Sequence, residues 1–132
     1  MNLFVYGTLQ SPRVFRMVTG EELNAPKLGY VQGFMKVTMM GLEYPWLVRG
    51  PKLICSGRIL ENVREVTLTR LAKYEGSHYH SEEVNATLVG QRHIIPCSMF
   101  VPNEVIHEGW DLAQFERNFE LAVKEKTPNQ ET

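Results

Sequence analysis

The segment FVYGTLQSP, from Phe4 to Pro12, joins an apolar, strand-like run to a helix start through a Gly-Thr turn. A short strand that feeds a helix N-terminus through a loop of small residues leaves several backbone N–H groups without a local partner. Such donors point outward and can hold an anion, or a group that becomes anionic. The segment therefore predicts a mixed fold in which this loop is a candidate binding element.

Three segments have the apolar spacing and the end signals of helices. The first starts at Pro12, which suits the first helical position after a capping serine, and ends at Gly20. The second covers residues 64–76 and ends in Gly76, and the third covers residues 111–126. The predicted buried face of the second helix holds Leu68, Leu71 and Ala72.

Several other segments are typical of strands, because they mix β-branched and aromatic residues with glycines. Leu28–Met39 and Leu53–Leu60 are predicted strands, with a loop over residues 41–51 between them. Residues on both sides of Gly90-Gln91 alternate as in a hairpin, and Pro96 indicates an edge or a bulge in its second strand. Strands outnumber helices, which predicts an α+β fold: a small mixed, strongly twisted β-barrel flanked by short helices.

The chain has 132 residues, which predicts a single domain over residues 1–126 and a frayed tail over residues 127–132. A formal net charge of -1 argues against nucleic acid or an anionic membrane as a partner. Cys55 and Cys97 lie in apolar segments and are predicted to be buried, reduced thiols. The N-terminal residues MNLFVYG do not resemble a signal peptide, and no apolar run is long enough for a membrane span, so we expect a cytoplasmic protein.

Glu75 is an unusual residue for the last turn of a helix, where the macrodipole favours cations. Tyr74, Tyr79 and Gly76 surround it in the sequence KYEGSHY. One interpretation is a solvated glutamate at a helix end. The other is a carboxylate in an aromatic pocket, where desolvation would raise its pKa and allow it to exchange protons with a substrate.

His78 and His80 alternate as strand residues do, so both could face one way and bind a metal ion. A third ligand is missing from the neighbouring sequence, and His93 and His107 are distant along the chain. We therefore favour surface histidines and predict no metal site. No serine stands in a G-x-S-x-G turn and neither cysteine lies in an electropositive loop, which disfavours covalent catalysis.

Five short motifs occur in an order and at spacings that resemble the gamma-glutamylcyclotransferase-like (AIG2-like) family. They are VYGTL at Val5–Leu9, GFM at Gly33–Met35, YPWLV at Tyr44–Val48, SGRIL at Ser56–Leu60 and LAKYEGSHY at Leu71–Tyr79. The resemblance extends from about Phe4 to Pro102. Its most specific part is the YGTL turn followed, after the GRIL strand, by YEG-x-x-Y.

The resemblance implies a small mixed barrel in which the YGTL loop and the YEG glutamate meet in one cavity. The implied reaction converts a gamma-glutamyl amide to 5-oxoproline and a free amine, without a metal or a cofactor. By motif position, Glu75 matches the general acid/base. Tyr79 is predicted to contact the substrate, and the predicted substrate-binding loop consists of Tyr6, Gly7, Thr8 and Leu9.

The chain departs from the family pattern at several positions. Family members often have an aspartate where this chain has Ala72, an arginine at His80-Ser81 and a tyrosine near Phe100. Two hypotheses follow. Glu75 favours an enzyme acting on a gamma-glutamylamine, a gamma-glutamyl amino acid or an isopeptide fragment, whereas the absent arginine and aspartate favour a non-catalytic module that binds a small gamma-glutamyl or other anionic ligand.

Overall fold

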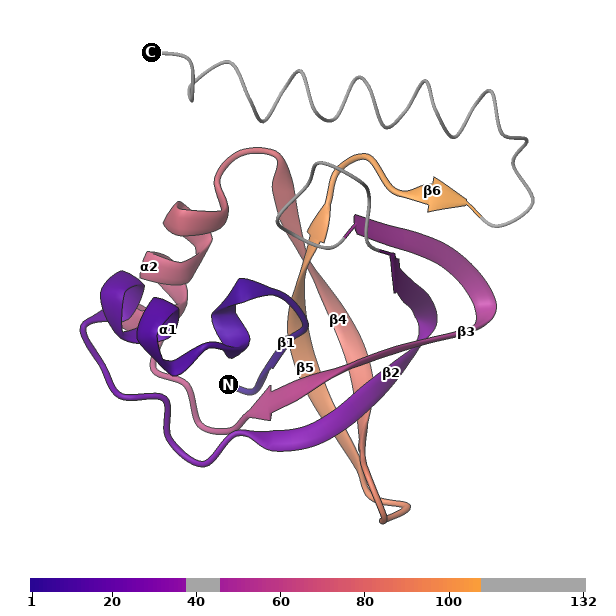
Figure 1. Ribbon diagram of the computed structural model, residues 1–132, viewed down its shortest axis with the longest axis horizontal. Coiled ribbons are helices and arrows are strands. Elements are labelled where there is room, and N and C mark those ends of the chain that lie inside the picture. Colours follow the sequence, from indigo (N-terminus) through magenta and orange to yellow (C-terminus); the bar gives the residue numbers. More distant parts are fainter. Residues whose placement is uncertain (38–45, 108–132) are drawn as a thin grey trace.

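The computed structural model describes residues 1–37 and 46–107, in which two groups of helices separate three groups of strands along the chain (Figure 1). The helices are a short 3₁₀ helix η1 (Thr8–Gln10), α1 (Pro12–Thr19) and α2 (Glu65–Glu75). The strands are β1 (Leu3–Val5), β2 (Lys27–Val37), β3 (Trp46–Leu60), β4 (Tyr79–Leu88), β5 (Ile94–Pro102) and β6 (Ile106–His107). Within the described residues, no helix is long and apolar enough to cross a membrane.

The sheet closes on itself because β1 has a strand on each side. The order is β1-β5-β4-β2-β3, and β1 also pairs with β3, which makes a closed five-stranded barrel. Leu3 of β1 lies opposite Leu60 in an antiparallel ladder and opposite Ser98 in a parallel one. Strand β6 extends the sheet beside the start of β3. The predicted α+β fold with a small mixed barrel is therefore confirmed.

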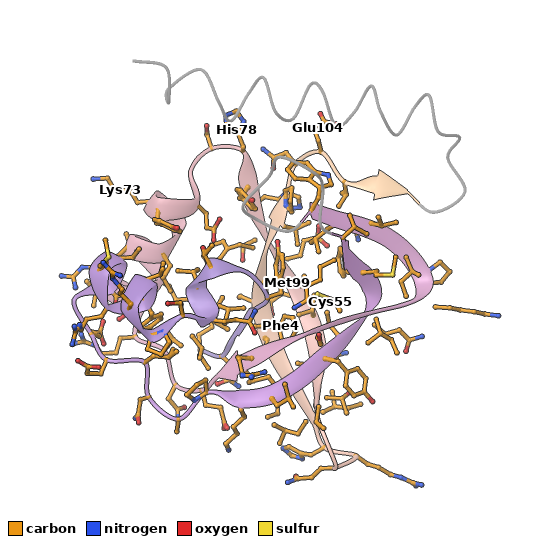
Figure 2. All side chains as sticks on the ribbon, in the orientation of Figure 1. Phe4, Cys55, Lys73, His78, Met99 and Glu104 are labelled. Carbon is orange, nitrogen blue, oxygen red and sulfur yellow. The ribbon has the colours of Figure 1, made fainter. Side chains whose placement is uncertain are left out.

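The described residues form two apolar clusters, and the alternation of side chains along β1 contributes to both. Phe4 points into the barrel, where Figure 2 shows it near Cys55 and Met99. Leu3 and Val5 point the other way and pack with Phe15 of α1 and Leu71 of α2. This arrangement explains why all of β1 is apolar and buried.

Gly57 permits the close approach of β3 to β1. A Cβ atom at this position would lie 2.3 Å from the backbone oxygen of Val5 and 2.7 Å from the Phe4 ring. Any larger side chain would therefore push the closing strand away from its neighbour.

The ends of the first helix follow the local signals in the sequence. The Ser11 side chain accepts a hydrogen bond from the Val14 N–H, and Gly20 ends α1 in the left-handed conformation with φ 76°. The second helix is confirmed, but its buried face differs from the predicted one. Leu71 is buried, but Ala72 is exposed, and the other buried residue of the helix is Thr67, whose hydroxyl donates to the Glu21 carboxylate.

The loop predicted over residues 41–51 is wrong from Trp46 onward, because β3 begins there. Its first residues are buried and continue the ladder with β2, with Trp46 opposite Val37. The register between β2 and β3 shifts at Gly33, and Pro51 lies in the part of β3 that has no ladder partner there. The residues that resemble a loop are thus accommodated at an irregularity in a long strand. Residues 38–39 of the predicted second strand, residues 41–45 of the loop and the predicted helix over 111–126 lie outside the described residues.

The hairpin around Gly90-Gln91 is confirmed, but Pro96 does not mark an edge strand, because β5 lies between β1 and β4. The Ser98 N–H donates to the Asn2 carbonyl at 2.9 Å, so the backbone N–H of Ser98 points toward the N-terminal segment that contains β1. By the two-residue period, the nitrogen of Pro96 faces the same side, just before β1 begins. The missing N–H of the proline therefore costs no ladder bond.

Candidate functional site

The loop after β1 exposes backbone donors, as the sequence predicts. Gln10 N–H donates to the Gly7 carbonyl and Ser11 N–H to the Thr8 carbonyl, which forms the short helix η1. Among the residues that the structure describes, the N–H groups of Gly7, Thr8 and Leu9 have no hydrogen-bond acceptor. The loop can therefore donate to a group of negative charge. The Leu9 side chain is buried in the core beneath the helices, so it anchors the loop and does not itself reach a ligand.

Tyr6 connects this loop to the barrel. Its ring is buried, and its hydroxyl donates to the Phe100 carbonyl at 2.7 Å. Its own carbonyl accepts a hydrogen bond from the Lys36 ammonium at 3.4 Å. Burial raises the pKa of Tyr6 well above its ordinary value, and the nearby Tyr79 and Glu75 raise it further, so Tyr6 remains a neutral phenol.

The C-terminal end of α2 meets the loop. Glu75 is the last residue of this helix and is half-buried, and Tyr79, also half-buried, begins β4. The Thr8 and Tyr74 hydroxyls lie 3.3 Å apart and join the loop to the helix. The structure therefore brings Tyr6, Thr8, Glu75 and Tyr79 to one end of the barrel. The Tyr74 side chain remains 48% exposed, so it covers Glu75 less than the sequence suggests.

Gly76 ends α2 in a conformation that other residues avoid. Its φ of 84° and ψ of -175° belong to a region that is almost restricted to glycine. Its N–H donates to the Ala72 carbonyl at 3.0 Å, and Tyr79 N–H donates to its carbonyl at 3.3 Å. The chain thereby reverses immediately after Glu75.

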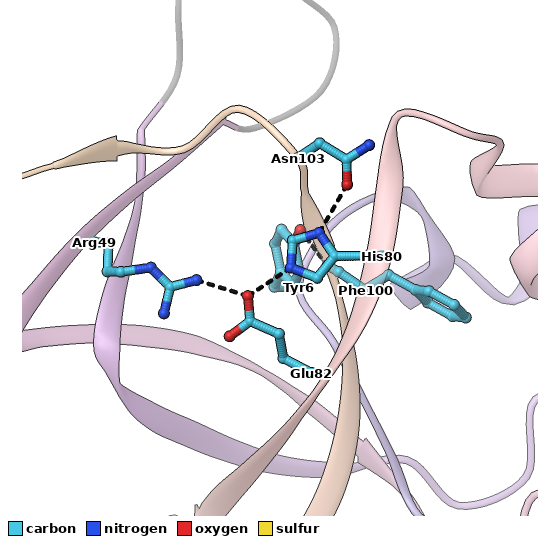
Figure 3. Close-up of polar contacts among 6 residues, drawn as sticks. All are labelled: Tyr6, Arg49, His80, Glu82, Phe100 and Asn103. Carbon is cyan, nitrogen blue, oxygen red and sulfur yellow. Dashed lines mark hydrogen bonds and ion pairs between the residues drawn. The ribbon is translucent and has the colours of Figure 1, made fainter.

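A polar network crosses the barrel beside this site and was missed from the sequence (Figure 3). The Arg49 guanidinium donates to the Glu82 carboxylate at 2.6 Å, and the same oxygen lies 2.7 Å from His80 Nε2. His80 Nδ1 lies 2.8 Å from the Asn103 side-chain oxygen. The period-two pattern of β4 does contain a signal, because His80 and Glu82 fall on the same face as Val84, which packs against the barrel core. No local pattern identifies Arg49 and Asn103 as their partners.

The network sets the charge of its members. Hydrogen bonds to Glu82 and Asn103 raise the pKa of His80. Burial alone raises the pKa of Glu82, but its bonds to Arg49 and His80 outweigh burial and lower it. The groove where β2 and β4 separate, about 870 Å³ in volume, is lined by Arg49 and Glu82 and by none of the predicted site residues.

The predicted alternation of His78 and His80 along a strand, on which the metal hypothesis depended, is wrong. His78 lies in the turn before β4 rather than in a strand, so it does not alternate with His80. Both ring nitrogens of His80 have partners already. Within residues 1–37 and 46–107, no group of three or more histidine, cysteine, aspartate or glutamate side chains could hold a metal ion.

The prediction of buried, reduced cysteines is confirmed. Cys55 and Cys97 are both buried free thiols. Burial raises the pKa of each to about 11, so both remain protonated near neutral pH.

Comparison with known proteins identifies relatives of this chain. The family model "Gamma-glutamyl cyclotransferase, AIG2-like" matches residues 3–118. A comparison with curated protein sequences returned no match.

The fold resembles several solved structures. A protein from Arabidopsis thaliana known from a solution structure has a TM-score of 0.70 at 19% identity, over 99% of this chain and 87% of that one. The crystal structure of an AIG2-like protein from Mus musculus has a TM-score of 0.64 at 22% identity, over 77% of this chain and 76% of that one. A structure described as gamma-glutamyl cyclotransferase has a TM-score of 0.57 at 13% identity, over 98% of this chain and 82% of that one.

Proposed function

The chain belongs to the gamma-glutamyl cyclotransferase, AIG2-like family, and from this premise we propose that it converts a gamma-glutamyl amide to 5-oxoproline and a free amine. One observation supports this proposal most directly. Glu75 lies beside a loop whose N–H groups at Gly7, Thr8 and Leu9 lack acceptors in the described residues. A group that accepts protons and a set of donors for negative charge are the two elements that this reaction requires.

The proposed reaction is an intramolecular acyl transfer. The substrate's α-amino nitrogen attacks the γ-carbonyl carbon and forms the C–N bond of the five-membered ring. The bond from that carbon to the leaving amine nitrogen then breaks. The proton that the α-amine loses ends on the leaving amine, and Glu75 is the carboxylate we propose to accept it and return it.

The loop supplies electrostatic help in this proposal. Donors at Gly7, Thr8 and Leu9 can hold the developing oxyanion of the γ-carbonyl or the α-carboxylate of the substrate. Tyr6 and Tyr79 lie near Glu75, and in this proposal both contact the bound substrate. Folding the substrate so that its amine faces its own carbonyl contributes about 7–11 kcal/mol in well-oriented intramolecular reactions.

The decisive experiment measures 5-oxoproline after incubation with a panel of gamma-glutamylamines, gamma-glutamyl amino acids and gamma-glutamyl-ε-lysine. Release of 5-oxoproline with a stoichiometric amount of amine supports the proposal and identifies the leaving group. Binding of a panel compound without release would instead support a non-catalytic module for small gamma-glutamyl ligands. If no compound of the panel is bound and no 5-oxoproline is released, both functions are rejected.

A further inference from the structure

The turn that follows Glu75 is held by a residue at the end of the neighbouring strand, β5. Asn103 comes directly after β5, and its backbone N–H donates to the His78 carbonyl at 2.8 Å. Its side-chain amide nitrogen donates to the Ser77 carbonyl, also at 2.8 Å. Asn103 therefore holds two consecutive carbonyl groups of the turn that begins at Gly76.

Asn103 is held in turn by His80. Because the Asn103 amide nitrogen faces Ser77, its side-chain oxygen must face His80 Nδ1, at 2.8 Å. The other ring nitrogen of His80 faces the Glu82 carboxylate at 2.7 Å. Both ring nitrogens thus meet acceptors, and only the doubly protonated imidazolium can donate to both.

We propose that His80 and Asn103 are positioning residues for Glu75: the His80 imidazolium orients the Asn103 amide, and Asn103 fixes the turn that sets the end of α2. This inference rests on the proposed function, because Glu75 is the carboxylate that the proposed reaction uses. Figure 3 shows the network from Arg49 through Glu82 and His80 to Asn103.

Loss of the His80 proton changes this contact in a definite way. A neutral ring keeps one N–H, and the Glu82 carboxylate is the stronger acceptor for it. The lone pair of Nδ1 then faces the Asn103 oxygen, and the amide must move away from Ser77. The charged groups that act on His80 from the described elements are Glu82 on β4 and Arg49 on β3. The pKa of His80 is raised, so its ring loses the proton at a pH above the ordinary pKa of histidine.

The first test is Asn103→Ala, with Asn85→Ala as the matched control. Asn85 is an exposed asparagine of β4 on the face opposite His80. We expect Asn103→Ala to lower kcat by about 10- to 100-fold with KM changed less than about twofold, because a small misplacement of a reacting group costs up to about 10²-fold. Asn85→Ala should match the wild type. Equal kcat values for the two variants would overturn the positioning role.

The second test is a pH series on the wild type, Glu82→Gln and Glu83→Gln. Glu83 is on the opposite face of β4 and contacts Ser98, so its variant is the control for loss of one negative charge. The readouts are kcat and the hydrogen-exchange protection factors of the Tyr79 and Asn103 amides, with the His80 ring titrated by NMR.

In the wild type and in Glu83→Gln, kcat and both protection factors should fall together as the pH rises through the measured pKa of His80. In Glu82→Gln this step should disappear, because glutamine can donate to Nε2 and the neutral ring then keeps its Nδ1–H on Asn103. A step in Glu82→Gln at the wild-type pH, or no step in the wild type, would overturn the inference. If the wild type releases no 5-oxoproline, the proposed function fails, while the protection factors still decide whether His80 and Asn103 hold the turn.

Discussion

The Thr8 hydroxyl lies 3.3 Å from the Tyr74 hydroxyl, and this contact joins two segments that are far apart in the sequence. Thr8 belongs to the loop whose N–H groups lack acceptors in the described residues, and Tyr74 directly precedes Glu75. The contact therefore joins the loop to the end of α2, next to Glu75.

Glu75→Gln should abolish turnover while the fold and much of the ligand affinity remain. Glutamine keeps the size of glutamate but cannot accept the proton of the α-amine, and loss of a general acid/base typically costs about 10²–10⁴-fold in rate. The measurement is 5-oxoproline release by both proteins on the best substrate, with thermal melts as the folding control. Equal turnover in the two proteins would remove Glu75 from the mechanism.

Treatment with a chelator should leave turnover unchanged. Ring closure needs a base and a set of hydrogen-bond donors, and the substrate itself supplies the nucleophile, so the proposed chemistry has no step for a Lewis acid. The assay compares 5-oxoproline release before and after dialysis against EDTA. If activity were lost and then restored by zinc, His78 and His80 would have to be reconsidered as ligands.

Tyr6→Phe should lower the free energy of unfolding by about 1–3 kcal/mol, because it leaves the partly buried Phe100 carbonyl without its donor. Denaturant titrations should show a lower midpoint with an unchanged m-value. Tyr30→Phe, at a residue outside the apolar core, is the control and should change stability by less than about 0.5 kcal/mol. Equal midpoints for the two variants would mean that the Tyr6 hydroxyl contributes nothing to stability.

The stabilisation contributed by the His80–Glu82 pair should be largest between about pH 4.5 and 6.5. The folded-state pKa of His80 is raised above 6.5, so its contribution is complete below that pH and is lost as the pH rises through the raised value. The folded-state pKa of Glu82 is lowered below 4.5, so its contribution is complete above that pH and is lost as the pH falls through the lowered value.

Denaturant titrations at several pH values test this window. The difference in free energy of unfolding between the wild type and Glu82→Gln should peak inside it and decrease on both sides. A difference that is constant from acid to alkaline pH would show that the pair is not a source of pH-dependent stability.

Signals contained in a few adjacent residues predicted the structure well. Ser11 and Gly20 define the ends of α1, and the alternation around Gly90-Gln91 defines the β4–β5 hairpin, because capping and pleating depend on local geometry. Local signals gave a wrong prediction where contacts between distant segments determine the conformation. Pro51 resembles a loop residue, but the register shift between β2 and β3 accommodates it.

For the candidate site too, local motifs were informative and contacts between distant segments were not predictable. The YGTL and YEG motifs predict the loop and Glu75 as candidate site residues, and the structure does bring Thr8 and Tyr74 together. The pairing of Arg49 with Glu82 depends on the register of two strands and on the curvature of the barrel, neither of which any stretch of sequence specifies.

The double pairing of β1 has a consequence for the order in which the molecule assembles. This strand lies between residues near Leu60 on one side and residues near Ser98 on the other, so both its ladders join distant parts of the chain. Such contacts close large loops and form slowly. During synthesis β1 leaves the ribosome before β5 and must therefore wait for that strand before it is enclosed, and until then its apolar residues and unpaired edge are exposed to other chains.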